Sequence, residues 1–316
     1  MTAKAATYVG RFAPSPSGPL HLGSAAAALA SYLDAKAHGG RWLLRIEDVD
    51  TARTVAGAAD CIVDQLRWLG MGWDGPVVQQ SRRGERYREA FERLVAAGKV
   101  YGCACSRREI ADSLSVLRDD ESRVDHPAGA TTDPAERVYP GTCRNGIPGG
   151  RAPRAWRFRV DDSVVAFQDR RLGPKCQHPA RDAGDFVVLR ADGVWAYQLA
   201  VTVDDADAGV THVVRGEDLL GSTGRQVLLQ RALGLPTPAY LHTPLAIGPD
   251  GRKLSKQNGA TSITAPDAGG RVRAPCEVLD AAARILGLEP PTARGTGEWL
   301  REATGRWARR FGPAPA

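Results

Sequence analysis

The stretch YVGRFAPSPSGPLHLGS (residues 8–24), continued by AAAALASYLDAKAHGGRWLLRIED (residues 25–48), is the most informative part of the sequence. Its beginning, 8–12, is typical of a short strand that runs into a stiff, proline-rich loop. A helix is predicted over 23–38, ending at two glycines, and a mostly apolar strand over 42–46. Strand, helix and strand in this order predict a βαβ unit, and therefore an α/β fold with a parallel sheet.

Hydrophobic spacing predicts the elements that follow. Further helices are expected over 56–69, 84–97 and 223–233, and two helical patterns follow residue 257. A polar stretch, 118–136, is predicted to be a mobile loop. Strands are expected over 156–160, 186–189, 194–203, 209–214 and 241–247.

Composition excludes whole classes of protein. The 316 residues suggest about two domains, and 43% hydrophobic with 25% charged residues excludes both a disordered chain and a membrane protein. No uninterrupted apolar stretch approaches the length of a membrane helix, and the N-terminus is too short for a signal peptide, so a cytoplasmic protein is expected. The net charge of +6 is compatible with a polyanionic partner. Six unevenly spaced cysteines argue against a disulfide framework.

Residues 14–24 form the first candidate site, because they connect a strand to a helix N-terminus. Unpaired amides at such a terminus bind phosphate, His21 could donate to it, and Gly23 would let a nucleotide approach the backbone. The plainer alternative is that His21 merely caps the helix.

The second candidate site is Lys253-Leu254-Ser255-Lys256-Gln257, which follows a glycine turn. Two lysines on one loop could surround a triphosphate and offset the charge that builds on a leaving pyrophosphate. A solvated basic loop is the alternative.

Three cysteines form the third candidate site: Cys103 and Cys105 in a C-x-C pair, and Cys143 further along. Three thiolates can bind zinc tetrahedrally with a fourth nitrogen or oxygen ligand. The alternative is a set of unliganded, buried thiols.

Together the first two sites resemble the class I aminoacyl-tRNA synthetases. Their HIGH motif is similar to 21–24 and their KMSKS motif to 253–257, although Ser24 and Gln257 depart from the motifs. The resemblance extends over 8–286. Segments 10–18, 44–48, 203–205 and 214–218 resemble the glutamyl branch in particular.

The resemblance implies the fold and its division. It implies a Rossmann-like class I catalytic domain, an inserted zinc-containing α+β acceptor-binding domain and a short helical C-terminal region. The expected boundaries are 1–101 for the first catalytic half, 102–195 for the insertion, 196–248 for the second catalytic half, and 249–316 for the KMSKS loop and helical region.

A glutamate pocket follows from charge and from the resemblance. Arg11 and Arg215 could each clamp a carboxylate, Glu47 could take the ammonium, and the Tyr197 hydroxyl could orient the side chain. A structural Arg–Glu pair at the strand ends is the alternative. The residues expected to line the pocket are Arg11, Phe12, Ala13, Pro14, Ser15, Glu47, Tyr197 and Arg215.

The resemblance also assigns the nucleotide and metal ligands. His21, Lys253 and Lys256 are expected to be catalytic, and Mg²⁺ to accompany ATP. The expected ATP-binding residues are His21, Gly23, Ser24, Lys253, Ser255 and Lys256. The expected ligands of one structural Zn²⁺ are Cys103, Cys105, Tyr139 and Cys143.

The stretch after 257 decides between the glutamyl enzymes. It is shorter than an anticodon-binding domain, which takes on the order of 100 to 150 residues. The chain therefore resembles the glutamyl-queuosine tRNA(Asp) synthetases, which activate L-glutamate with ATP without needing tRNA. That family transfers the glutamate to the cyclopentenediol of queuosine in the anticodon of tRNA(Asp). A monomer without a membrane partner is expected.

Three alternatives stay open. The chain could be a short glutamyl-tRNA synthetase that charges tRNA(Glu), a non-catalytic tRNA-binding paralogue, or a ligase that attaches glutamate to another acceptor.

Overall fold

The computed structural model describes residues 7–110, 138–248, 251–254, 261–266 and 270–313. The polar stretch 118–136 lies outside these residues. The strands are β1 Val9–Phe12, β2 Arg41–Ile46, β3 Val78–Gln79, β4 Val100–Cys103, β5 Ala155–Phe158, β6 Val165–Asp169, β7 Gly173–Gln177, β8 Val187–Leu189, β9 His212–Gly216 and β10 Ala239–Thr243. The helices are α1 Leu22–Ala37, α2 Ala58–Trp68, α3 Gly84–Ala96, α5 Pro179–Asp182, α6 Tyr197–Asp207, α7 Thr223–Leu233, α8 Pro275–Ile285 and α9 Thr296–Phe311.

The βαβ unit predicted at the N-terminus is confirmed. β1 and β2 pair in parallel, with Val9 opposite Arg41 and Phe12 opposite Leu44, and α1 connects them. The predicted end of the helix is confirmed at Gly39, whose φ of 60° favours glycine. β3 extends this sheet in parallel beside β2.

A second sheet, ordered β7-β6-β10-β9, meets the first through Thr211. The Thr211 amide donates to Val9 O at 2.9 Å, and the Val9 amide donates to Thr211 Oγ1 at 2.9 Å. β9, β10 and β6 pair in parallel, so the carboxyl ends of these three strands lie at one edge of the sheet. β7 is antiparallel to β6 and forms a hairpin with it that was not predicted.

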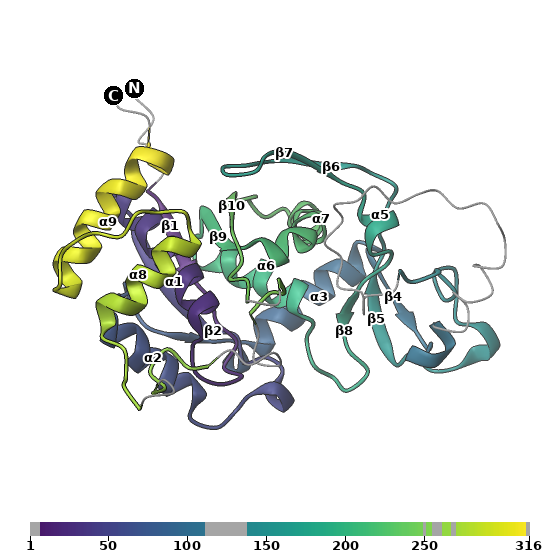
Figure 1. Cartoon of the computed structure of the whole chain (residues 1–316). Coiled ribbons are helices and arrows are strands. Elements are labelled where there is room, and N and C mark those ends of the chain that lie inside the picture. Colours follow the sequence, from purple (N-terminus) through teal and green to yellow (C-terminus); the bar gives the residue numbers. More distant parts are fainter. Residues whose placement is uncertain (1–6, 111–137, 249–250, 255–260, 267–269, 314–316) are drawn as a thin grey trace.

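The two helical patterns predicted after residue 257 are confirmed as α8 and α9, which pack against α1 (Figure 1). Small side chains on α1 let the helices approach closely, and the carboxylate of Asp34, which is fully buried, accepts from Trp307 Nε1 at 2.9 Å. The C-terminal helices therefore belong to the same core as β1 and β2.

A third sheet, β4-β5-β8, is antiparallel and lies in the other half of the molecule (Figure 1). Its strands share a hydrophobic core with α3, α6 and α7. The chain between β4 and β8 therefore forms a region that mixes short strands and a short helix.

The strand predicted over 194–203 is wrong, because α6 begins at Tyr197. The run of valine and leucine there favours a strand by composition. In the structure these side chains are buried on all sides, and Gln198, Asp204 and Asp205 are buried with them. A helix without an exposed face lacks the polar side that would reveal its period in the sequence.

Among the described residues, no helix has the length and apolar character needed to cross a membrane.

Candidate active site and cysteine cluster

His21 caps the N-terminus of α1. Its Nδ1 accepts from the Gly23 amide at 3.1 Å and the Ser24 amide at 3.3 Å, and Ser24 Oγ accepts from the His21 amide at 3.3 Å. The prediction that the first-turn amides are unpaired is therefore wrong for Gly23 and Ser24. Because Nδ1 accepts, the neutral imidazole carries its proton on Nε2, which is the nitrogen that can donate.

The chain that follows the predicted pyrophosphate loop returns to this helix terminus. Residues His21 and Ser262 form an isolated antiparallel bridge, and the Ile263 amide donates to Leu20 O at 2.9 Å. The structure thus brings together two stretches that are far apart in the sequence.

Gly23 and the chain segment of Lys253 and Leu254 both lie near Ala246. A β carbon at Gly23 would be 3.4 Å from the Ala246 Cβ, and the Ala246 carbonyl accepts from the Leu254 amide at 2.7 Å. Lys253 Nζ pairs with Asp218 at 2.6 Å. Outside the described residues lie Ser255, Lys256 and Gln257.

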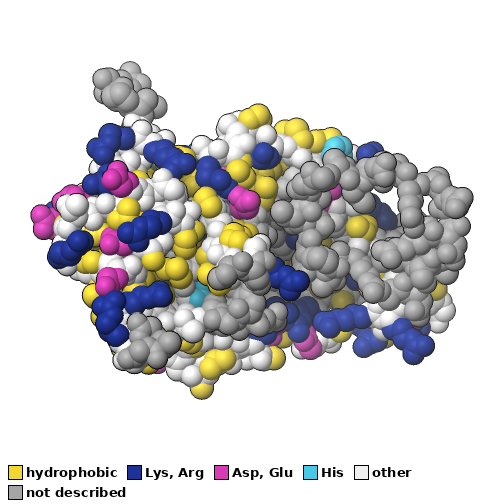
Figure 2. All heavy atoms as spheres, in the orientation of Figure 1, with side chains coloured by type: hydrophobic (Ala, Val, Ile, Leu, Met, Phe, Trp, Pro, Cys, Tyr) yellow, Lys and Arg dark blue, Asp and Glu magenta, His cyan; other side chains and the backbone are white. Residues whose placement is uncertain are grey.

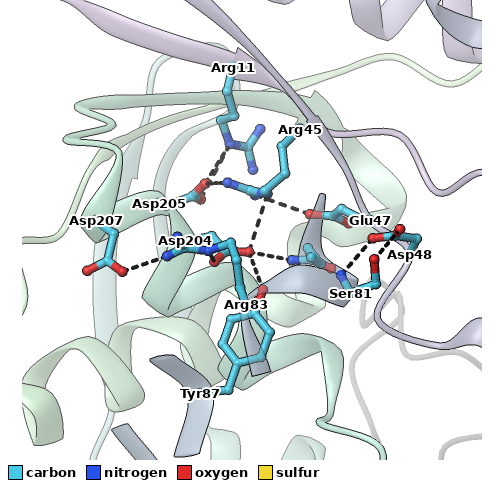
Figure 3. A network of polar contacts seen from close by, with 11 residues as sticks. Arg11, Arg45, Glu47, Asp48, Ser81, Arg83, Tyr87, Asp204, Asp205 and Asp207 are labelled. Atoms are coloured by element: carbon cyan, nitrogen blue, oxygen red, sulfur yellow. Dashed lines mark hydrogen bonds and ion pairs between the residues drawn. The ribbon is translucent and has the colours of Figure 1, made fainter. Parts of the chain in front are cut away.

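Arg11, at the end of β1, belongs to a buried group of charges (Figure 3). Its Nε donates to Asp205 Oδ1 at 3.1 Å, and Arg45 Nη1 donates to the same oxygen at 2.7 Å. Arg45 Nη2 pairs with Glu47 at 3.1 Å. Although burial opposes it, the Arg11 and Arg45 guanidiniums lower the pKa of Asp205. The Arg–Glu pair weighed as an alternative thus exists, but between Arg45 and Glu47.

Asp204 is the second centre of this network (Figure 3). Its Oδ2 accepts from Gln80 Nε2 at 2.7 Å and from the Tyr87 hydroxyl at 2.8 Å, while Oδ1 accepts from Arg83 Nε at 2.6 Å. Arg45 Nε lies 3.7 Å from the same carboxylate. These contacts fix α6 against β2 and α3, and so hold Asp205 in place.

Tyr197, at the start of α6, is electrostatically coupled to the residues predicted to bind glutamate. Burial and then Glu47 raise the pKa of Tyr197 to about 12, while Arg215 and Arg11 oppose the rise. Burial, offset in part by Arg45 and Arg11, also raises the pKa of Glu47. The structure therefore places Arg11, Glu47 and Arg215 within electrostatic range of Tyr197.

Arg215, in β9, is buried among neutral acceptors. Its Nε donates to His242 Nε2 at 3.1 Å, Nη1 to Gln226 Oε1 at 2.7 Å and Nη2 to Thr223 Oγ1 at 2.9 Å. Within the described part of the chain, no carboxylate forms an ion pair with Arg215. A buried cation without a counter-charge favours an anionic ligand.

The loop after β1 lies beside Glu47. The Glu47 amide donates to Pro14 O at 2.9 Å, which ties the end of β2 to this loop. Phe12 and Pro14 are buried, Ala13 is half-buried and Ser15 is exposed. This contact keeps the predicted pocket-lining loop close to the charged group.

Several residues around the site had no role in the sequence interpretation. Arg45 and the pair Asp204 and Asp205 stood inside matching segments without an assigned task, and Asp169 and His242 were not singled out. Arg45 interrupts an otherwise apolar strand, which is the one signal that could have indicated its buried charge.

The three cysteines converge with Tyr139, as predicted from the resemblance. Their sulfurs lie within 4.8 Å of one another. The Tyr139 hydroxyl lies 3.4 Å from Cys103 Sγ and 3.6 Å from Cys105 Sγ, and it accepts from the Cys143 amide at 2.8 Å. Three soft sulfur donors and one oxygen form a donor set that suits zinc.

Although burial opposes it, hydrogen bonds with Tyr139 and Arg157 lower the pKa of Cys103. Burial, opposed by Tyr139 and reinforced by Cys143 and Cys103, raises the pKa of Cys105 to about 11. Burial also raises the pKa of Tyr139, so the Cys105 thiol and the Tyr139 phenol are held in their protonated forms. A divalent cation would reverse this effect, because it stabilises the deprotonated ligands.

A surface pocket of about 460 Å³ lies beside the cluster. The lining of this pocket includes Tyr101, Cys143, Arg144, Asn145, Trp156 and Arg159. In RNA complexes, guanidinium groups and aromatic rings like these contact phosphates and bases.

Comparison with known proteins places the chain in a family. Residues 8–294 match the family of class I tRNA synthetases (E and Q), catalytic domain. The glutamyl-Q tRNA(Asp) synthetase of Bordetella bronchiseptica is 55% identical over 306 residues, which cover 96% of this chain and 90% of that protein. That of Burkholderia cenocepacia is 54% identical over 97% of this chain and 98% of its own length.

Solved structures agree with this placement. A glutamate tRNA ligase from Elizabethkingia meningosepticum, in complex with its amino acid, superposes with a TM-score of 0.73 at 27% identity. The match covers 98% of this chain and 66% of that ligase. The chain therefore belongs to the class I tRNA synthetase family, within the group of the glutamyl-Q tRNA(Asp) synthetases.

Proposed function

We propose that the chain uses ATP to convert glutamate to glutamyl-adenylate, without needing tRNA, and transfers the glutamyl group to the cyclopentenediol of queuosine in tRNA(Asp). The observation that supports the activation step is the electrostatic coupling of Tyr197 to Glu47, Arg215 and Arg11. The relatives' names support the acceptor.

Charge explains the choice of amino acid. Glutamate brings two carboxylates and one ammonium, so its net charge of −1 matches the buried charge of Arg215, which pairs with no carboxylate among the residues that the structure describes. Arg11 is held side-on at its Nε by Asp205, which directs the other edge of its guanidinium away from that carboxylate. Glu47 supplies the negative charge for the ammonium.

In the first step, a glutamate carboxylate oxygen attacks the α-phosphorus of ATP. A new P–O bond forms, the bond between the α-phosphorus and the α,β-bridging oxygen breaks, and pyrophosphate leaves. Mg²⁺ bound to ATP would help to neutralise the phosphate charge. His21 donates from Nε2 to the phosphate oxygens, where charge develops. Lys253 and Lys256 bind the pyrophosphate. Before ATP binds, the Lys253 ammonium forms an ion pair with Asp218.

In the second step, a queuosine hydroxyl attacks the acyl carbon of the adenylate. An ester C–O bond forms, AMP leaves, and the hydroxyl proton passes to solvent or to the phosphate. No residue described here is needed as a strong base, because the mixed anhydride is already activated.

The region 102–195 is the part of the chain that we assign to the RNA acceptor. Figure 2 shows Lys and Arg side chains gathered along the lower edge of the half that holds β4, β5 and β8. Such groups supply sequence-independent contacts to phosphates. Exposed arginines among the described residues of this region are Arg107, Arg108, Arg151, Arg154 and Arg181.

One structural Zn²⁺ fits the cysteine cluster. Cys103, Cys105 and Cys143 would hold it as thiolates, with the Tyr139 oxygen as the fourth donor. When bound, the ion would tie β4 to the turn that contains Cys143. The residues on either side then carry the acceptor-binding surface at a fixed distance from the active site.

The acceptor is tested by incubating the protein with ATP, labelled glutamate and tRNA that carries or lacks queuosine, followed by nuclease mapping. Label on the queuosine nucleoside of tRNA(Asp) is expected. Label at a 3′-terminal adenosine would instead establish an ordinary glutamyl-tRNA synthetase. Activation without transfer to RNA would favour another acceptor, and absence of both steps a non-catalytic paralogue.

A further inference from the structure

Three neighbouring strands align three polar side chains beneath the amino acid site. β10 lies between β6 and β9, with Tyr240 opposite Asp169 and His242 opposite Arg215. Asp169 and His242 are both fully buried, although neither belongs to the residues predicted to bind substrate. Buried polar groups of this kind persist only where their hydrogen bonds are satisfied.

The hydrogen bonds run in one direction: Arg215 donates to His242, and His242 donates to Asp169. Asp169 Oδ2 accepts from His242 Nδ1 at 2.7 Å and from the His242 amide at 3.0 Å. Because Nδ1 donates to the carboxylate, Nε2 of the neutral ring is an acceptor, and it lies 3.1 Å from Arg215 Nε. The other tautomer would place two donors against each other.

The Asp169 carboxylate, the final acceptor of these hydrogen bonds, is itself held in place. Asp169 Oδ1 accepts from the amides of Arg171 at 3.0 Å and Leu172 at 2.8 Å, in the turn of the β6–β7 hairpin. Asp169 therefore cannot rotate away from His242 without losing two backbone bonds.

His242 completes the fixation of Arg215. Gln226 and Thr223 hold the two terminal nitrogens, and His242 holds Nε, so the guanidinium plane is defined by three neutral acceptors. A carboxylate in place of His242 would neutralise Arg215 and weaken its attraction for an anion. An imidazole acceptor orients the guanidinium and leaves its charge uncompensated.

We propose that Asp169 and His242 are positioning residues for Arg215, and that the neutral Nε2 acceptor aims a fully charged guanidinium at a carboxylate of the bound glutamate. This inference rests on the proposed activation of glutamate. It adds two residues, neither of which touches the substrate, that determine how tightly glutamate binds.

Two substitutions at one position separate the two hydrogen bonds of His242. Glutamine can place its Oε1 near the position of Nε2, so H242Q keeps an acceptor for Arg215. Asparagine reaches only the position of Nδ1, so H242N keeps the bond to Asp169 and loses the acceptor. The matched control is H212Q, because His212 is a partly buried histidine in β9 that does not contact Arg215.

The readout is glutamate-dependent exchange of pyrophosphate into ATP, measured as separate KM values for glutamate and ATP. We expect H242N to raise the glutamate KM by about tenfold to hundredfold with little change in the ATP KM. H242Q should stay within about threefold of the parent, as should H212Q. Equal glutamate KM values for H242N and the parent, or an equal loss in H242Q and H242N, would overturn the proposal.

A spectroscopic measurement on the parent protein keeps the test independent of folding and of activity. The ¹⁵N chemical shifts of the His242 ring should report a neutral imidazole protonated at Nδ1. Protonation at Nε2 would overturn the proposal even if the variants cannot be purified. A parent protein without exchange activity but with the expected tautomer would refute the proposed function. The hydrogen bonds from Arg215 to His242 and from His242 to Asp169 would then have only a structural role.

Discussion

The charged group around Arg11 and the cysteine cluster differ in how their polar side chains are balanced. In the charged group, guanidiniums and carboxylates largely compensate one another, with Asp205 shared by Arg11 and Arg45. In the cysteine cluster, sulfur and phenol donors converge on each other. Arg215 differs from the other arginines of the site, because its hydrogen-bond acceptors are neutral. The cysteine cluster brings together three sulfurs and one phenol oxygen, a donor set that suits a cation.

This contrast indicates where each region gets its rigidity. The charged group is preorganised by its own hydrogen bonds, so substrate binding need not order it. The cluster joins β4 to a loop with little hydrophobic core of its own, in which Tyr101, Cys103, Tyr139 and Cys143 form a small separate group. A bound ion would supply there what hydrophobic burial supplies elsewhere.

The largest effect is expected where the charge is uncompensated. R215Q should lower kcat/KM for glutamate in the exchange reaction by about hundredfold or more, because a buried charge that faces an anionic ligand is removed. Its melting temperature should also fall, because the buried acceptors on His242, Gln226 and Thr223 lose a donor, so the kinetics are measured at a temperature at which the variant is folded. The control is R231Q, on the exposed side of α7. Parent-like kinetics in R215Q would contradict the role of this arginine.

The next effect concerns the compensated part of the same group. D205N should lower the free energy of unfolding by about 3–5 kcal/mol, because it leaves Arg11 and Arg45 buried with too little negative charge. Urea unfolding checks this value against D64N, which breaks the exposed pair of Asp64 with Arg67 and should cost less than about 1 kcal/mol. Similar losses in both variants would show that the buried network does not stabilise the fold.

The cysteine cluster should respond to metal removal, whereas the charged group should not. Purified protein is expected to contain about one zinc per chain, and a strong chelator should lower its melting temperature by several degrees. C103A should lose the metal, while C276A, outside the cluster, should keep it. Protein without zinc, combined with a C103A variant as stable as the parent, would remove the metal site.

The smallest effect is expected from His212, a histidine that has no role in either site. Burial, with Arg170 adding to it, lowers the pKa of His212 to about 4. In the unfolded chain His212 binds a proton below about pH 6.5, whereas in the folded chain it does so only below about pH 4. The free energy of unfolding therefore falls as the pH drops from about 6.5 to about 4. H212Q should show a shallower fall. Identical pH profiles of stability for H212Q and the parent would show that His212 does not contribute.

Local sequence patterns predicted much of the fold and one part of the site. Strand, helix and strand at the N-terminus follow from periodicity and glycine stops, and so do α7, α8 and α9. The helix α6 could not be predicted in this way, because burial on every side removes its polar face. Its misassignment as a strand also hid the fact that Asp204 and Asp205 lie on one helix.

Local sequence patterns could not predict which residues form hydrogen bonds with the site residues. Arg11 was expected to clamp a carboxylate, but nothing near it in the sequence indicates that Asp205, from α6, holds its Nε. His242 likewise meets Arg215 only because β10 lies beside β9. Long-range pairs of this kind depend on topology, whereas the cysteine spacing gained its meaning from the resemblance to a family.

The most direct test of the central claim is pyrophosphate exchange into ATP without any RNA, measured with glutamate, glutamine and aspartate in turn. The buried arginines predict exchange with glutamate that is far faster than with glutamine, which lacks the second carboxylate, or with aspartate, whose side chain is one methylene shorter. Exchange that requires RNA, or that proceeds equally with glutamine, would contradict the account.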